Sequence, residues 1–90
     1  MKTKDLEFRG IPLHHLGMYF EELGGRKDSD SFPISYYGEN WSAEILCEEE
    51  IAFTAAFKVN AVHIRFMAEN LEILEWVINN YRKKTFRAGG

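Results

Sequence analysis

The sequence predicts an α+β domain in the order strand, helix, four strands, helix, built on a five-stranded, mainly antiparallel sheet. Two segments, 12–23 and 68–84, repeat apolar residues at the spacing of one helical face. The stretch between them alternates apolar and polar residues, as half-buried strands do. Because one helix precedes these strands and one follows them, both apolar helix faces can pack on the same side of a single sheet, leaving the other side open.

The size and charge of the chain limit its organisation and its partners. Its 90 residues suffice for one core, so we expect a single domain over residues 1–86 and a flexible tail over residues 87–90. A net charge of −3 disfavours binding to nucleic acid or to a membrane surface. The sequence has neither a signal-peptide apolar run nor a span of ~20 apolar residues, so we expect a cytoplasmic protein.

The N-terminal part predicts a strand followed by a helix. Alternation over Lys4–Arg9 indicates a short strand. Pro12 suits a first helical turn, and we expect the helix to run to about Leu23, where Gly24-Gly25 can end it. Gly17 lies inside this helix, where glycine costs about 1 kcal/mol relative to alanine. We therefore expect another backbone to approach Gly17 closely, such as that of the second helix.

The rest of the chain predicts a polar loop, an antiparallel meander and a long helix. We expect turns at residues 38–40, at the acidic run 48–50 and at residues 58–60. Cys47, Phe53, Ala55 and Phe57 fall on the core side of the predicted alternation. The expected loop, strands and helix are Arg26–Ser31, Phe32–Tyr37, Trp41–Cys47, Ala52–Lys58, Val59–Met67 and Ala68–Lys84.

The open face of the predicted sheet is the first candidate contact surface. His63 and Arg65 lie two residues apart on a strand, so they point the same way and could receive an anion or an acidic peptide. The alternative is a solvated face on which Glu44 and Glu48 pair with these positive charges. The residues expected on this face are Ser35, Tyr37, Ser42, Glu44, Leu46, Thr54, Ala56, Lys58, His63 and Arg65.

The histidines and the cysteine predict no catalytic, cofactor or metal site. His14 and His15 are adjacent on a helix, so they diverge by about 100° and do not readily ligate one ion. His15 and Glu22 could supply two ligands, but no third ligand lies at a useful spacing. Cys47 is the only cysteine, which rules out an internal disulfide, and a thiol on the core side is normally inert. We expect a non-enzymatic protein.

The second candidate contact surface lies on the last helix. Ile73 and Trp76 sit beside its main apolar stripe and would form a patch if they project past the sheet. Such a patch suits an unidentified protein partner or a second copy of the chain, as in a homodimer. The full candidate partner surface is Tyr37, Lys58, His63, Arg65, Ile73 and Trp76.

The chain ends in Gly89 and Gly90, and this end resembles the ends of two kinds of carrier protein. Sulfur carriers and ubiquitin-like modifiers end in a glycine pair whose terminal carboxylate is adenylated and converted to a thiocarboxylate or a thioester. A segment without side chains can enter a narrow active-site channel and align for attack. The alternative is an ordinary frayed terminus.

Taken over nearly the whole chain, the pattern resembles the small domain that follows the sulfur-carrier half in MoaD-related proteins, relatives of the molybdopterin synthase small subunit. That resemblance implies a fold similar to the TATA-box-binding protein, with a curved sheet and an open face. It does not include the β-grasp half that carries the terminal glycines in sulfur carriers. The resemblance rests on the order of elements and on Pro12-Leu13, Leu23-Gly24-Gly25-Arg26, Trp41-Ser42-Ala43-Glu44-Ile45, Val62-His63-Ile64-Arg65-Phe66 and Phe86-Arg87-Ala88-Gly89-Gly90.

Three functions therefore stay open from the sequence. The first is a non-enzymatic interaction domain working beside molybdopterin or sulfur-carrier machinery. The second is a sulfur carrier or small modifier activated at Gly90. The third is a small-ligand-binding domain with a pocket between helices and sheet, for which Gly17, Ala43, Ala55 and Ala56 are small enough to leave space.

Overall fold

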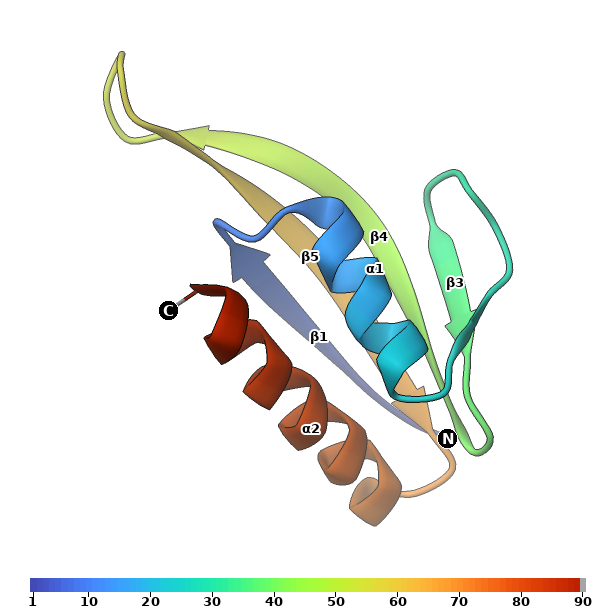
Figure 1. Ribbon diagram of the computed structural model, residues 1–90. Helices are drawn as coiled ribbons and strands as arrows, with labels where there is room; N and C mark the ends of the chain where they lie inside the picture. Colours follow the sequence, from blue (N-terminus) through green and yellow to red (C-terminus); the bar gives the residue numbers. More distant parts are fainter. Residues whose placement is uncertain (90) are drawn as a thin grey trace.

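The computed structural model describes residues 1–89, with the side chains of residues 1–86. Five antiparallel strands form one sheet in the order β1-β5-β4-β3-β2, and two helices accompany it (Figure 1), which confirms the predicted α+β class. The elements are β1 Lys2–Arg9, α1 Leu13–Glu22, β2 Arg26–Lys27, β3 Ile34–Tyr37, β4 Trp41–Ala52, β5 Lys58–Ala68 and α2 Leu71–Gly89.

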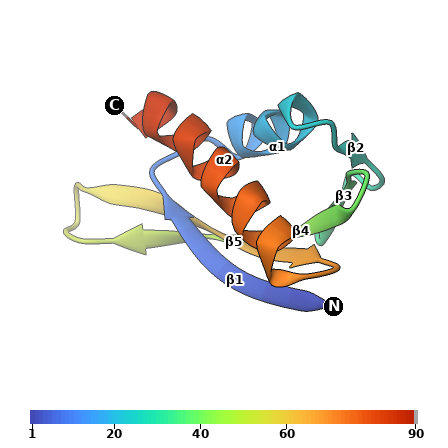
Figure 2. The same cartoon turned by 90° about the horizontal axis from the view of Figure 1, so that it is seen from below.

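Both helices lie side by side on one face of the sheet, as Figure 2 shows from below. The hairpin formed by β4 and β5 projects beyond them, so the helices cover only part of that face (Figures 1 and 2). At the contact between the helices, the hydroxyl of Tyr81 donates a hydrogen bond to the Leu16 carbonyl at 2.7 Å. Burial raises the pKa of Tyr81 far above its usual range, because a charged phenolate would be desolvated there.

Aromatic rings fill the centre of the core. Phe20 of α1 stacks on Tyr81 of α2 at 4.2 Å between ring centroids, and both rings contact Phe66 of β5. All three side chains are fully buried. This cluster joins the two helices to β5 through large buried rings, which give a small domain the contact area that it needs.

The strands of the meander differ from the prediction. The segment Ala52–Lys58 is not a separate strand, because β4 continues through the acidic run to Ala52 and the chain turns at residues 53–57. The Thr54 hydroxyl accepts hydrogen bonds from two backbone N–H groups in this turn, whereas residues 48–50 offer no turn chemistry. The fifth strand is Arg26–Lys27, predicted as loop, which pairs with the end of β3.

A β-bulge at Leu46 divides β4 into two parts. Ile45 lies opposite Ile64, but Cys47 lies opposite His63, so β4 has one extra residue here. After the extra residue the side chains exchange faces, because the alternation restarts one position later. Cys47 is therefore exposed on the open face, and the prediction that it points to the core is wrong.

The bounds of the two helices depend on their caps. Gly24, with φ of +92°, ends α1 as predicted. We expected the backbone of α2 to approach Gly17. Instead, the side chain of Tyr36 fills the space beside it.

The second helix begins later and ends later than predicted. Ala68 is still paired in β5, and the Asn70 side chain accepts a hydrogen bond from the Ile73 N–H at 2.9 Å, which caps the first turn of α2. The helix continues through Gly89, whereas Gly90 lies outside the described residues. The division into a domain of residues 1–86 and a tail of residues 87–90 stays a prediction. Within the described residues, no helix is long and apolar enough to cross a membrane.

Candidate functional site

The open face of the sheet carries paired charges. Arg65 donates two hydrogen bonds to the Asp5 carboxylate, at 2.9 and 3.1 Å. These bonds lower the pKa of Asp5 below its usual value and raise the pKa of Arg65 above its own. Glu44, one of the two predicted partners, adds a favourable charge near Arg65, while Glu48 instead accepts a hydrogen bond from Asn60. The solvated-face alternative is supported, with Asp5 as the main partner.

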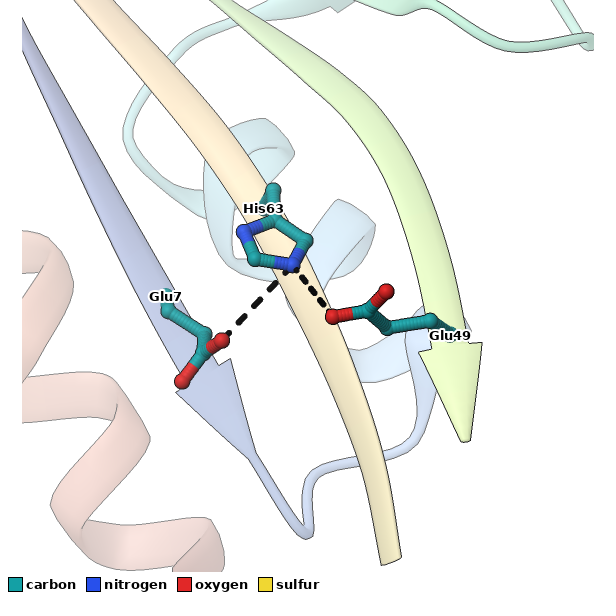
Figure 3. A group of neighbouring side chains, drawn as sticks. All are labelled: Glu7, Glu49 and His63. Atoms are coloured by element: carbon teal, nitrogen blue, oxygen red, sulfur yellow. Dashed lines mark hydrogen bonds and ion pairs between the residues drawn. The ribbon is translucent and has the colours of Figure 1, made fainter. Parts of the chain in front are cut away.

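His63 is the centre of a three-residue cluster on the same face (Figure 3). Its Nε2 atom lies 3.1 Å from Glu49 Oε1 and 3.6 Å from Glu7 Oε2. The two glutamates come from strands on either side of β5, and the three side chains converge on one point. The cluster is open to solvent, since the exposed fractions are 34% for His63, 32% for Glu7 and 58% for Glu49.

The bulge explains why Glu49 belongs to this cluster. Glu7 lies directly opposite His63 on β1, so the strand pairing alone brings these two together. Glu49 lies opposite Ala61, one diagonal step from His63. Without the extra residue at Leu46, position 49 would continue the alternation of Ile45 and point to the helix side. Sequence reasoning missed Glu49 because it placed a turn at residues 48–50, and it missed Glu7 because the pairing of β1 with β5 could not be predicted.

A shallow recess of about 550 Å³ surrounds this cluster. Besides the three clustered residues it is lined by Asp5, Leu6, Leu46 and Cys47. Cys47 lies on β4 opposite His63, so the one thiol of the chain is exposed beside the imidazole. The recess therefore gathers an imidazole, carboxylates and a thiol, which are the side chains that bind transition metals.

Two of the residues predicted on the open face, Lys58 and Tyr37, lie apart from His63. Lys58 belongs to the other face of β5, because five residues separate the two positions and strand side chains alternate. Its ammonium lies 3.8 Å from Glu50 Oε1. Tyr37 is half-exposed at the end of β3, which is separated from β5 by β4. The placement of Lys58 on the open face was therefore wrong.

The apolar flank of α2, which we define as Leu71, Ile73 and Trp76, is the second surface. Trp76 is 52% exposed and Leu71 is 56% exposed, while Ile73 packs partly against the core. A groove of about 390 Å³ runs from this flank to the turn between β3 and β4, where it is bounded by Glu39, Asn40 and Glu72. The flank thus combines a large apolar side chain with an acidic border.

The tip of the β4–β5 hairpin carries two further exposed rings. Phe53 and Phe57 are more than half exposed and lie 5.6 Å apart between ring centroids. The prediction that they belong to the core is wrong, because the hairpin extends past both helices (Figure 1). Their alternation with Thr54 and Ala56 resembles a strand in the sequence, but residues 53–57 form the turn, and nothing local shows where helix cover ends.

The pocket predicted from small residues does not form as expected. Gly17 lines a groove of about 480 Å³ between α1 and the β2–β3 edge, where Asp30 raises the pKa of Lys27 through a hydrogen bond at 2.9 Å. Ala43 is instead fully buried, and Ala55 and Ala56 lie in the exposed hairpin turn. The ligand-binding alternative stays a prediction.

A family model described as "Archaeal MoaD-like protein" matches residues 4–90. The chain belongs to this MoaD-like family. A comparison with curated proteins gave no match. The resemblance that the sequence suggested is thereby confirmed at the level of the family.

The other predicted site residues of this MoaD-like chain lie away from the open face. Gly89 is the last residue of α2, and Gly90 lies outside the described residues. His14 and His15 begin α1, with ring centroids 4.4 Å apart. Glu22, the other ligand considered for His15, accepts a hydrogen bond from Lys84 at 2.7 Å. Of this group, the two neighbouring histidines are the ones that the structure brings together within its described residues.

Proposed function

We propose that this MoaD-like chain is a non-enzymatic accessory domain that binds a protein of a molybdopterin or sulfur-carrier pathway through the apolar flank of α2. The exposed Trp76 carries the proposal. A half-exposed tryptophan next to a groove is a typical centre of a protein–protein contact. The family match supports the choice of pathway in this proposal. The resemblance to the TATA-box-binding protein belongs to the same proposal, and the uncovered sheet face supports it.

The open sheet face is the less suitable docking surface. Its cations are already neutralised by carboxylates, so an acidic partner would have to displace the bidentate pair of Arg65 and Asp5. On the flank of α2, by contrast, a partner would cover apolar surface without breaking an ion pair. The acidic border at Glu39 and Glu72 favours a partner with basic residues around an apolar centre.

The test is direct binding to purified candidate partners. A sulfur-carrier protein, its adenylating enzyme and the large subunit of a molybdopterin synthase are each titrated with the labelled chain. We expect one of them to bind, and the Ile73→Ala/Trp76→Ala variant to bind at least about tenfold more weakly. The His63→Ala/Arg65→Glu variant should bind as tightly as the wild type.

The control for this experiment removes equally exposed aromatic surface elsewhere. The Phe53→Ala/Phe57→Ala variant should keep full affinity, because its rings lie at the hairpin tip. Equal binding by the Ile73→Ala/Trp76→Ala variant would refute the assignment of the surface. Sedimentation of the chain alone tests the homodimer, which would hide the same flank from other proteins.

A second candidate function is a carrier activated at Gly90, which the family match favours. This function needs a free carboxylate at Gly90 and an extended end, whereas α2 remains helical through Gly89. The last turn of α2 would therefore have to unwind before an activating enzyme could take it. Incubation with that enzyme, ATP and a sulfur donor should replace one oxygen of the terminal carboxylate by sulfur, which a measurement of the intact mass detects. Deletion of Gly90 should prevent this change. An unchanged wild-type mass would reject the carrier.

A further inference from the structure

We propose that Glu7, Glu49 and His63 form a binding site for Zn²⁺ on the open face of the sheet. The three ligand atoms all lie within 4.8 Å of one another. Zinc bonds of ~2.0–2.1 Å in a tetrahedron place neighbouring ligand atoms ~3.3–3.4 Å apart. The distances from His63 Nε2, 3.1 and 3.6 Å, lie on either side of that value. Shifts of a few tenths of an ångström would therefore suffice for these two ligand pairs.

The balance of charge on this face also favours a cation. Elsewhere on this face Asp5 and Arg65 form a one-to-one ion pair. Around His63, by contrast, two carboxylates share the imidazole and the Arg9 guanidinium, which pairs with Glu7, and among the described residues Glu49 has no cationic partner besides the imidazole. A divalent cation would neutralise the excess negative charge that two converging glutamates create.

The strands hold the ligands in place before a metal arrives. Each ligand comes from a different strand of one continuous sheet, which is a more rigid support than a loop. Arg9 donates to Oε1 of Glu7 at 2.7 Å, which leaves Oε2 directed at His63 (Figure 3). Arg9 is thus a positioning residue that orients one carboxylate, as outer partners of metal ligands commonly do.

The ligand set selects the kind of metal. An imidazole with two carboxylates suits zinc and its first-row neighbours, whereas Mg²⁺ keeps its waters and prefers oxygen ligands alone. In the metal-free protein His63 Nε2 faces the carboxylate of Glu49, so that nitrogen carries the hydrogen of their contact. Zinc would take the place of this hydrogen, and the neutral imidazole would then carry its hydrogen on Nδ1. The recess leaves the fourth position to water.

The test is calorimetric titration of chelator-treated protein with Zn²⁺. We expect one zinc per chain with a dissociation constant of about 10 μM or lower, and no comparable heat with Mg²⁺. His63→Ala should weaken binding at least about 100-fold, and Glu49→Gln at least about tenfold, because each removes a ligand. Zinc should also raise the Tm of the wild type by several degrees but not that of His63→Ala.

The matched control is Glu50→Gln, the next residue on β4. Its carboxylate faces Lys58 on the other side of the sheet, so zinc affinity should change less than about threefold. Cys47→Ser should also change it less than about threefold, because the proposed site does not use the thiol. Circular dichroism of each variant confirms that the fold is retained.

Three results would overturn the zinc site. One is the absence of zinc binding to the wild type below about 1 mM. Another is unchanged affinity in His63→Ala together with loss of binding in His14→Ala/His15→Ala, which would place the metal on α1. The third is a loss of more than about tenfold in Cys47→Ser, which would contradict the set of three ligands. None of these results bears on the partner surface of α2.

Discussion

The two parts of β4 differ in what covers them. Residues 41–45 alternate between the helix-covered core and a half-buried outer face, and Ile45 and Ala43 are almost fully enclosed. Residues 47–52 have the same strand geometry but are almost all exposed. The difference comes from the bulge at Leu46 and from the limited reach of the two helices. A strand segment thus acquires a core role only where another element can lie on it.

The largest expected effect is on stability, and it distinguishes a ring that the helices cover from a ring at the tip of the projecting hairpin. Phe66→Ala should lower the free energy of unfolding by about 3–5 kcal/mol, because Phe66 is fully buried among Phe20 and Tyr81. Phe57→Ala at the hairpin tip should change it by less than about 0.5 kcal/mol. Urea unfolding measures both. Similar losses in the two variants would show that the tip is packed in solution.

A smaller effect is expected for Gly17→Ala in the covered part. Alanine ordinarily stabilises a helix interior by about 1 kcal/mol relative to glycine. Here the new methyl group would collide with the Tyr36 side chain, so we expect a loss of about 1–3 kcal/mol. Tyr36→Phe in the same chain should restore part of that loss, which a double-mutant cycle measures. A gain in stability from Gly17→Ala alone would contradict the close contact.

Deletion of Leu46 should lower the free energy of unfolding less than a deletion inside a strand usually does. Because Leu46 is the extra residue, its removal lets Ile45 and Cys47 keep their partners Ile64 and His63 in regular alternation. We expect a cost of no more than about 1–2 kcal/mol in urea unfolding. The rate at which Cys47 reacts with a thiol reagent should change less than about threefold. Strong protection of Cys47 would mean that the strand had slipped by one residue.

The smallest effect belongs to the exposed pair of Asp5 and Arg65. The folded state lowers the pKa of Asp5, so the pair stabilises the fold at pH values above the unfolded pKa of ~3.9. This contribution is lost as the pH falls through the lower folded pKa. Asp5→Asn should therefore reduce the urea midpoint slightly at about pH 7 and leave it unchanged at about pH 2. A difference that persists in acid would assign the effect to something other than charge.

The regions that were predicted correctly share one property, which is a strong local signal. The helix over Leu13–Glu22 has both an apolar face and glycines after it, and β5 alternates without interruption. The two-residue strand Arg26–Lys27 has no such signal, since only its pairing with β3 makes it a strand. Among site residues, His63 and Arg65 were placed on the correct face because β5 contains no bulge.

The site residues that were missed depend on pairing between distant segments. Glu7 and Glu49 are forty-two positions apart, and each meets His63 only because β1 and β4 flank β5. One misplaced turn at residues 48–50 then removed Glu49 from consideration. The pattern of apolar and polar residues does not predict which strands become neighbours, because side-chain alternation is the same for any partner.

The sequence by itself determined the class of fold, the two helices and the apolar sides that they bury, because helical and strand periodicities are local properties. The tertiary structure alone decided which residues share the open face. An inserted residue in β4 reverses every side chain after it, and the length of the helices decides which part of the sheet stays uncovered. Both decisions arise from pairing and packing across the sheet, which no single segment contains.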